Sequence, residues 1–183
     1  MSPAVRAFVA LPLPEPWRDW LAAFTARESQ GLDSRLSWTR PGNWHVTLRF
    51  LGDVEEGRIA SIKQALAPLS FAPVPLAAAH AGFFPDARCP RVFWAGLDEP
   101  GARACADLAA AVDAALAPLG FSPEDRPFRA HATLARIRRQ GRDDFAALAA
   151  RVGPGGSAPP RAEARELVLY ASTLGPQGPR YSR

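Results

Sequence analysis

The pattern of hydrophobic and polar residues predicts the same alternation of strands and helices in the first half of the chain and in the second. Stretches rich in β-branched and aromatic residues predict strands, and apolar residues three or four positions apart predict helices. The first half gives a strand at 4–11, a helix at 15–27, a strand at 44–51, a helix after Asp53 and a strand at 75–83. The second half gives a strand at 91–97, a helix at 101–116, a strand at 128–137, a short helix at 143–151 and a final strand at 166–172.

Polar and turn-forming residues mark the connections between these elements. The segment 31–42 is polar and is expected to join a helix to the next strand. Asp53 and Glu56, three residues apart, form a capping-box-like start for the helix that follows. The Gly/Pro-rich segment 153–160 is expected to be a surface loop.

The spacing of the two halves indicates a duplication. Phe8 precedes His45 by 37 residues and Phe93 precedes His131 by 38, so each half carries one histidine strand at the same place. Two such repeats would most simply face one another across a pseudo-two-fold axis. That arrangement would put the two histidine strands on opposite walls of one cleft.

The predicted fold class is α+β. A chain of 183 residues fits a single domain, 1–183, made of two pseudo-symmetric β-α-β-α-β halves. The halves correspond to about 1–85 and 86–183, and their mainly antiparallel sheets are expected to face a central cleft. Apolar residues make up 48% of the chain, which is enough for a buried core.

Each histidine strand carries a threonine two positions after the histidine. Side chains at i and i+2 of a strand share a face, so His45 lies beside Thr47 and His131 beside Thr133. Two histidines flanking one group can act as general acid and general base, and threonine hydroxyls can donate hydrogen bonds to phosphate oxygens. The chain has no P-loop, no His-Glu-x-x-His and no Cys-x-x-Cys motif, and both His-x-Thr motifs lack carboxylates. We therefore expect metal-independent chemistry on a phosphate.

The net charge is +4, and arginine carries almost all of the positive charge because Lys63 is the only lysine. A positive field favours a polyanionic partner such as RNA, although an Ala-, Arg-, Pro- and Gly-rich composition also fits GC-biased coding. The sequence has no apolar run approaching the roughly 18 residues that span a bilayer and no secretory signal. A cytoplasmic location without membrane contact is expected.

Both motifs and their flanks resemble a known family. The sequence HVTLRFLG from His45 and the sequence PFRAHATLAR from Pro127 are similar to the two signatures of the two-histidine phosphoesterases, and most of all to the RNA 2′,3′-cyclic phosphodiesterases, also called 2′-5′ RNA ligases. The likeness covers nearly the whole chain, with FVALP at Phe8, GFFP at Gly82, PRVFWAGL at Pro90, LGP at Leu174 and GPRY at Gly178.

The resemblance implies a bilobal α+β fold and hydrolysis of a 2′,3′-cyclic phosphate to a 2′-phosphate, without metal or cofactor. By position, His45 would be the general acid that protonates the leaving O3′, and His131 the general base that activates water. Thr47 and Thr133 would hold the phosphate oxygens, and Arg136 would contact the phosphate or substrate.

Strand alternation gives a different ranking of the arginines. Arg136 is five residues after His131 and would face away from the cleft in a regular strand, unless the strand ends or bulges. Alternation instead favours Arg49 and Arg129, which stand four residues after and two before their histidines. Phe84, with Phe83 before a proline turn, is a further candidate because it could stack on a base.

The expected partner is RNA ending in a 2′,3′-cyclic phosphate, such as a tRNA fragment or an oligonucleotide, or a small cyclic nucleotide, bound by a monomer. Ligation, which joins a 2′,3′-cyclic phosphate to a 5′-hydroxyl through a 2′-5′ bond, is a variant reaction at the same site. Two other functions are open: a non-catalytic RNA-end binder, and a metal-dependent hydrolase using His45, His131 and His80. The missing carboxylates disfavour the metal-dependent hydrolase.

Overall fold

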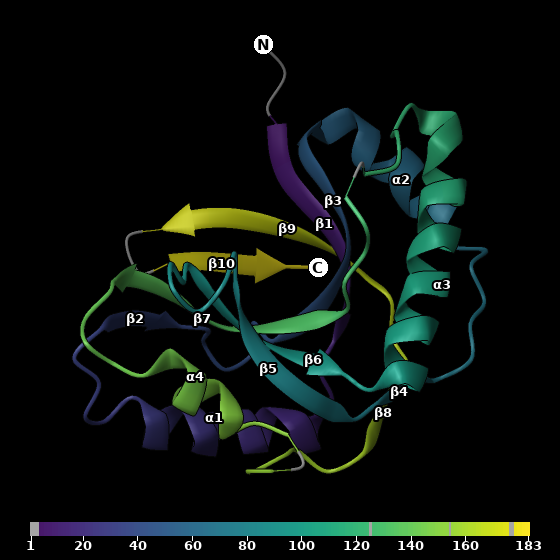
Figure 1. Ribbon diagram of the computed structural model, residues 1–183. Helices are drawn as coiled ribbons and strands as arrows, with labels where there is room; N and C mark the ends of the chain where they lie inside the picture. Colours follow the sequence, from purple (N-terminus) through teal and green to yellow (C-terminus); the bar gives the residue numbers. More distant parts are fainter. Residues whose placement is uncertain (1–3, 125, 154, 176–177) are drawn as a thin grey trace.

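A computed structural model describes residues 4–124, 126–153, 155–175 and 178–183. The described chain forms an eight-stranded sheet, a small two-stranded sheet and four α-helices, as Figure 1 shows. The elements in chain order are β1 (Ala4–Pro12), α1 (Glu15–Glu28), β2 (Arg35–Trp38), β3 (His45–Glu55), η1 (Glu56–Arg58), α2 (Ile59–Leu66), β4 (Val74–Leu76), β5 (Ala78–Phe84), β6 (Val92–Leu97), α3 (Glu99–Leu116), η2 (Ala117–Leu119), β7 (His131–Arg139), α4 (Phe145–Ala150), β8 (Ala162–Ala164), β9 (Val168–Gly175) and β10 (Gly178–Ser182).

The order of strands in the large sheet is symmetric about its centre. It runs β10-β9-β1-β3-β7-β6-β5, with β2 also paired to β7, and the paired strands are antiparallel. The order β9-β1-β3 on one side mirrors β5-β6-β7 on the other. The predicted α+β class with antiparallel strands and duplicated halves is therefore confirmed.

The two sides of the sheet differ from the two halves of the chain. Strand β5 belongs to the first half but pairs with β6, and β9 belongs to the second half but pairs with β1. The first half thus contributes β5 to the other side, and the second half contributes β9 together with β10. The division at residues 85/86 describes the repeat along the chain and not the two sides of the sheet.

The helices cover one face of the sheet, which is apolar, and they pack beneath both ends of the strand order. Helices α1 and α4 lie below β5 and β6 in Figure 1, whereas α2 and α3 stand to the right of β3. Phe93 of β6 is fully buried between the sheet and helices α1 and α4. Its ring stacks on Phe83 at 4.8 Å and contacts Phe24 of α1 at 6.4 Å, while Phe83 meets Phe145 of α4 at 5.1 Å.

The segment 31–42 is more than the predicted polar connection. Its residues Arg35–Trp38 form β2, which pairs with β7. Strand β3 pairs with β7 only between Val46 and Ala132. The same edge of β7 is therefore open at residues 135–139, and β2 pairs with it there. Backbone groups make this pairing, so the hydrophobic pattern of a four-residue strand gives little sign of it.

The predicted capping box at Asp53 is wrong. Strand β3 continues to Glu55, and Asp53 pairs with Arg6 of β1 instead of starting a helix. Pairing with β1 already satisfies the backbone hydrogen bonds at Asp53. The helical segment begins only after β3, with the 3-10 turn Glu56–Arg58, which has no side-chain cap. A side-chain cap does begin α3, where the Asp98 carboxylate accepts from the backbone N–H of Gly101 at 3.2 Å.

None of the described helices is both long enough and apolar enough to cross a membrane.

The Phe93 side chain is expected to contribute a large share of the stability. Phe93→Ala removes a fully buried ring and should lower the free energy of unfolding by about 3–5 kcal/mol. Phe50→Ala is the matched control, because that ring is 55% exposed, and it should lower the same quantity by less than about 1 kcal/mol. Urea unfolding followed by circular dichroism measures both. Equal losses would contradict the assignment of Phe93 to the core.

Candidate active site

The two histidine strands meet at a single pair of residues at the centre of the sheet. Val46 of β3 pairs with Ala132 of β7, and both side chains are fully buried on the helix-covered face. The strands are therefore neighbours in one sheet, and not the opposite walls of a cleft that the symmetry argument predicted. Because side chains alternate along a strand, both His-x-Thr motifs point to the other face.

The register at this pair determines how the four polar side chains are arranged. Continuing the antiparallel register of this pair by one residue in each direction brings His45 opposite Thr133 and Thr47 opposite His131. Each histidine thus lies beside the threonine of the other motif. The histidines occupy diagonal positions, which in an antiparallel pair are about 7–8 Å apart. A tetrahedral phosphate group fits between two such imidazoles.

Backbone carbonyls fix both imidazole rings in the same way. Nδ1 of His45 lies 2.7 Å from the carbonyl oxygen of Asn43, and Nδ1 of His131 lies 2.7 Å from that of Arg129. A carbonyl only accepts, so Nδ1–H must be the donor in each pair, and in the neutral ring Nε2 carries the lone pair. Within the described chain neither Nε2 nor either threonine hydroxyl has a hydrogen-bond partner, which leaves all four groups available to a ligand.

Aromatic rings enclose both histidines and explain their burial. The sequence motifs named only some of these residues, because most of them come from strands far away along the chain. Ring centroids lie 4.9, 6.1 and 5.4 Å from His45 for Phe8, Tyr170 and Tyr181, and 5.1 and 6.2 Å from His131 for Phe84 and Trp94.

Burial keeps both imidazoles mainly neutral in the unliganded protein. It lowers the pKa of His45 from its ordinary value of 6.5 to about 4, against a smaller opposing effect of the Asn43 carbonyl, and the charge of His131 lowers it further. Burial also lowers the pKa of His131, the Arg129 carbonyl opposes this, and the charge of Arg136 adds to the lowering. Because the two imidazoles repel each other when charged, the pair favours holding at most one extra proton.

The counterpart of Phe8 in the second half is Trp94 and not Phe93. Trp94 contacts His131 as Phe8 contacts His45, and it too stands 37 residues before its histidine. Phe93 faces the core. The spacing along the sequence predicted the equivalent position to within one residue. In a strand, however, a difference of one residue moves a side chain from one face of the sheet to the other.

A β-bulge brings Arg136 to the histidine face. Trp94 pairs with Thr133 and Phe93 with Ala135, so β7 carries an extra residue at Leu134. Leu134 and Ala135 are both buried, and Arg136 is exposed on the face of His131, where its charge acts on the imidazole. The argument from regular alternation therefore fails for Arg136.

The same irregularity in β3 turns Arg49 away from His45. Ala10 pairs with Thr47 and Val9 with Arg49, which leaves Leu48 as the extra residue. Arg49 is only 6% exposed, and the prediction that it shares the face of His45 is wrong. Phe50 takes that face instead, at the position corresponding to Arg136 in the second motif.

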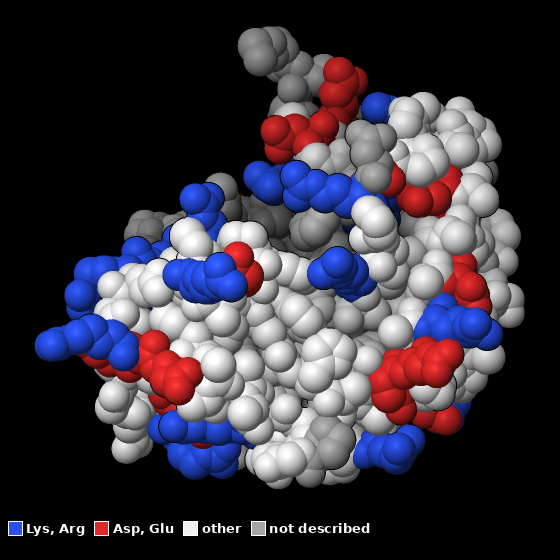
Figure 2. Space-filling view, in the orientation of Figure 1, with Lys and Arg blue, Asp and Glu red and all other residues white. Residues whose placement is uncertain are grey.

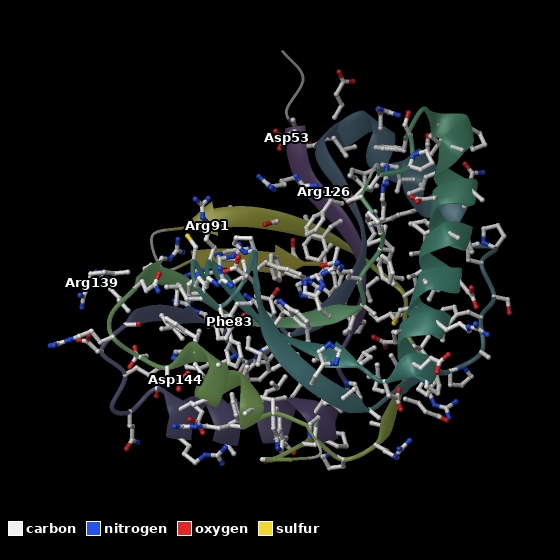
Figure 3. All side chains as sticks on the ribbon, viewed as in Figure 1. Asp53, Phe83, Arg91, Arg126, Arg139 and Asp144 are labelled. Carbon is white, nitrogen blue, oxygen red and sulfur yellow. The ribbon has the colours of Figure 1, made fainter. Side chains whose placement is uncertain are left out.

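Arg129 is exposed in the segment before β7, and its carbonyl accepts from His131. Phe84 stacks on Trp94 at 5.0 Å beside His131, whereas Phe83, labelled in Figure 3, belongs to the buried core. His80 is exposed on β5 and meets only the edge of Trp94 at 5.4 Å among ring contacts of the described residues.

A cavity of about 940 Å³ opens beside the histidines. Figure 2 shows this face hollowed between Lys and Arg side chains, and Figure 3 places Arg91 and Arg126 along it. The lining includes Thr47, His131, Phe84, Arg49, Arg91, Arg126 and Arg129, while His45, Thr133 and Arg136 lie outside it. No group of three or more His, Cys, Asp or Glu side chains able to hold a metal ion occurs in the described parts of the chain.

Comparison with known proteins identifies the family. A model described as "LigT like Phosphoesterase" matches residues 11–94 and 96–181, and the chain therefore belongs to the LigT-like phosphoesterases. An RNA 2′,3′-cyclic phosphodiesterase of Archaeoglobus fulgidus is 32% identical over 97% of this chain and 96% of its own length. One of Geobacillus stearothermophilus is 36% identical over 91% of this chain, which spans only 52% of that relative.

The fold agrees with solved structures of the family. The structure of E. coli LigT complexed with 3′-AMP superposes with a TM-score of 0.75 at 25% identity, covering 98% of this chain and 94% of that one.

The lowered pKa of His45 predicts a pH-dependent stability. Between pH 6.5 and about 4 the unfolded chain binds a proton that the folded protein does not, so the free energy of unfolding falls as the pH drops through this window. The loss assigned to His45 is about 3 kcal/mol. His45→Gln should make the urea-unfolding stability less steep in pH over this window, whereas His80→Gln, which retains the buried histidine, should keep the wild-type slope. An unchanged slope in His45→Gln would contradict the burial effect.

Proposed function

We propose that this protein hydrolyses RNA 2′,3′-cyclic phosphate ends to 2′-phosphates, with the two histidines as acid and base and without a metal ion. The observation that carries the proposal is the diagonal pair of imidazoles, each with Nδ1–H bound to a carbonyl and Nε2 facing the open side of the sheet. The names of the relatives, RNA 2′,3′-cyclic phosphodiesterases, support the substrate class.

The reaction needs one proton removed and one delivered on opposite sides of phosphorus. Water attacks phosphorus while Nε2 of neutral His131 takes its proton. The bond from phosphorus to O3′ breaks, and protonated His45 gives its Nε2 proton to that oxygen. The product has a 2′-phosphate and a free 3′-hydroxyl. The Thr47 and Thr133 hydroxyls donate to the non-bridging oxygens, where negative charge grows in the transition state.

A bound phosphate and Arg136 both affect the protonation of the two imidazoles. A phosphate anion between the rings raises the pKa of both imidazoles, because it compensates for lost hydration. Arg136 disfavours a charge on His131, whereas burial lowers the pKa of His45 to about 4, so these two effects oppose each other. The roles of His45 as the acid and His131 as the base are proposed from their positions in the two motifs. Arg136 also offers a planar donor group to the phosphate oxygens.

The arginines around the cavity suit an RNA end, either a tRNA fragment or an oligonucleotide, and a small cyclic nucleotide would occupy the same site. Arg129 and Phe84 would contact the substrate, as a phosphate ligand and a stacking surface. The protein would act as a cytoplasmic monomer, and ligation through a 2′-5′ bond would be the same step with an RNA 5′-hydroxyl attacking phosphorus in place of water.

Removing either histidine tests the acid/base pair. His45→Ala and His131→Ala should each lower kcat by a factor on the order of 10² or more on an RNA oligonucleotide ending in a 2′,3′-cyclic phosphate. The assay contains EDTA, and product ends are identified by mass and by phosphatase sensitivity. His80→Ala is the matched control and should retain wild-type turnover. Activity that needs added metal would reject the mechanism, and tight RNA binding without turnover would indicate an RNA-end binder.

Arg136 is expected to bind the phosphate and to influence His131. Arg136→Gln should lower kcat/KM by about 10- to 100-fold, as expected for a lost hydrogen bond to a charged group. It should also move the acidic limb of the kcat/KM profile to higher pH, because the pKa of His131 rises when the neighbouring positive charge is removed. Arg139→Gln is the control, since Arg139 lies at the outer edge of the molecule in Figure 3 and donates to the Asp33 carbonyl. A pH profile identical to wild type in Arg136→Gln would remove Arg136 from this role.

A further inference from the structure

The cavity extends beyond the histidines into the gap that β3 leaves when it separates from β7. After the single pair at Val46, the segment 126–129 runs beside β3 without pairing to it. The far end of the gap is closed by α3, which contributes Ala106, Ala109 and Ala110 to the lining. Small apolar side chains on one wall provide a flat surface of the kind that suits a planar ring.

A charged pair lies at the far end of this apolar extension. Arg49 Nη1 is 3.3 Å from Asp113 Oδ1, and the Arg49 side chain is only 7% exposed against 27% for Asp113. Arg49 also donates to the carbonyl of Ser122, while its Nε and Nη1 are buried without a hydrogen-bond acceptor in the described chain. The carboxylate of Asp113 is the accessible member of the pair, and it lines the cavity.

Stability is a poor explanation for this pair. Burying an arginine costs several kcal/mol of hydration, and an apolar pair in its place is often as stable or more so. The neighbouring wall formed by Ala106, Ala109 and Ala110 of α3 is apolar, and a carboxylate beside it offers an acceptor to the polar atoms of a ligand. The Arg49 guanidinium lies against the Asp113 carboxylate, and the accessible carboxylate can accept hydrogen bonds from the cavity.

An exposed aromatic ring lines the same cavity as this carboxylate. Phe50 is 55% exposed, lines the same cavity and lies 6.0 Å from Phe8, which in turn contacts His45. The equivalent position in the second motif is Arg136. The pseudo-symmetric site is thus polar beside β7 and aromatic beside β3, so a nucleotide would place its phosphate toward the arginine and its base toward the ring.

We propose that this extension binds the base of the terminal nucleotide and favours guanine. The base stacks on Phe50, and the Asp113 carboxylate accepts from the adjacent N1–H and N2–H of guanine. Adenine, cytosine and uracil each present fewer donors on that edge, since only guanine has two adjacent groups that donate to one carboxylate. The inference rests on the proposed function, because it assigns the substrate preference of that site.

The test compares the kcat/KM of wild type for the 2′,3′-cyclic phosphates of guanosine, inosine, adenosine, cytidine and uridine. Guanosine should be preferred over adenosine by a factor on the order of 10 or more. Inosine keeps N1–H but lacks the N2 amino group and should fall below guanosine by a factor on the order of 10. This comparison uses the unmodified protein, so it does not depend on whether a variant folds. Equal values for all five would overturn the inference while leaving the phosphodiesterase intact, and no turnover of any would reject the proposed function itself.

Variants then identify the group that recognises the base. Asp113→Asn has one acceptor oxygen in place of two and should reduce the ratio of guanosine to inosine toward one, with a smaller change for adenosine. Asp107→Asn, on the exposed side of α3, is the matched control and should keep the wild-type ratio. Phe50→Ala should raise KM for all five substrates without changing their order. If Glu124→Gln, at the cavity rim, lowers the ratio and Asp113→Asn does not, the assignment to Asp113 is wrong.

Discussion

The contact between Val46 and Ala132 is the constraint on which the rest of the site depends. It is the one described pair that joins β3 to β7, and so it joins the two sides of the sheet at its centre. Both side chains are fully buried, so the pair cannot shift by one residue without exposing an apolar face and burying the polar one. That register brings each histidine beside the threonine of the other motif and leaves the imidazoles diagonal to each other.

Two bulges then make a symmetric framework chemically asymmetric. Each histidine strand carries one extra residue three positions after its histidine, and each bulge returns the fifth position to the ligand face. The fifth residue is Phe50 in one motif and Arg136 in the other. A duplicated scaffold thereby gains one face for a phosphate and one for an apolar ring, and the charge of Arg136 acts on only one imidazole. The two histidines therefore have different surroundings although the backbone is nearly the same on both sides.

Burial is what makes the histidines responsive to a ligand. Aromatic rings remove water from both imidazoles, and the resulting loss of hydration lowers the pKa of each. An anionic phosphate placed between the Nε2 atoms supplies a compensating charge, so the proton required for catalysis is favoured when substrate is present. The carbonyls of Asn43 and Arg129 hold the rings in the tautomer that this exchange requires. The aromatic enclosure therefore contributes to reactivity as well as to packing.

The sequence by itself determined the α+β class, most strands and helices, the His-x-Thr pairs and the family, because hydrophobic period and local motifs are recorded in neighbouring residues. It did not determine β2, the exchange of β5 and β9 between the two sides, or the extent of β3 past Asp53, since these depend on backbone pairing with distant strands. The orientation of Arg136, Arg49 and Trp94 was decided only in the tertiary structure. A bulge reverses the alternation of side chains, and it arises from the match between two strands, which neither strand contains alone.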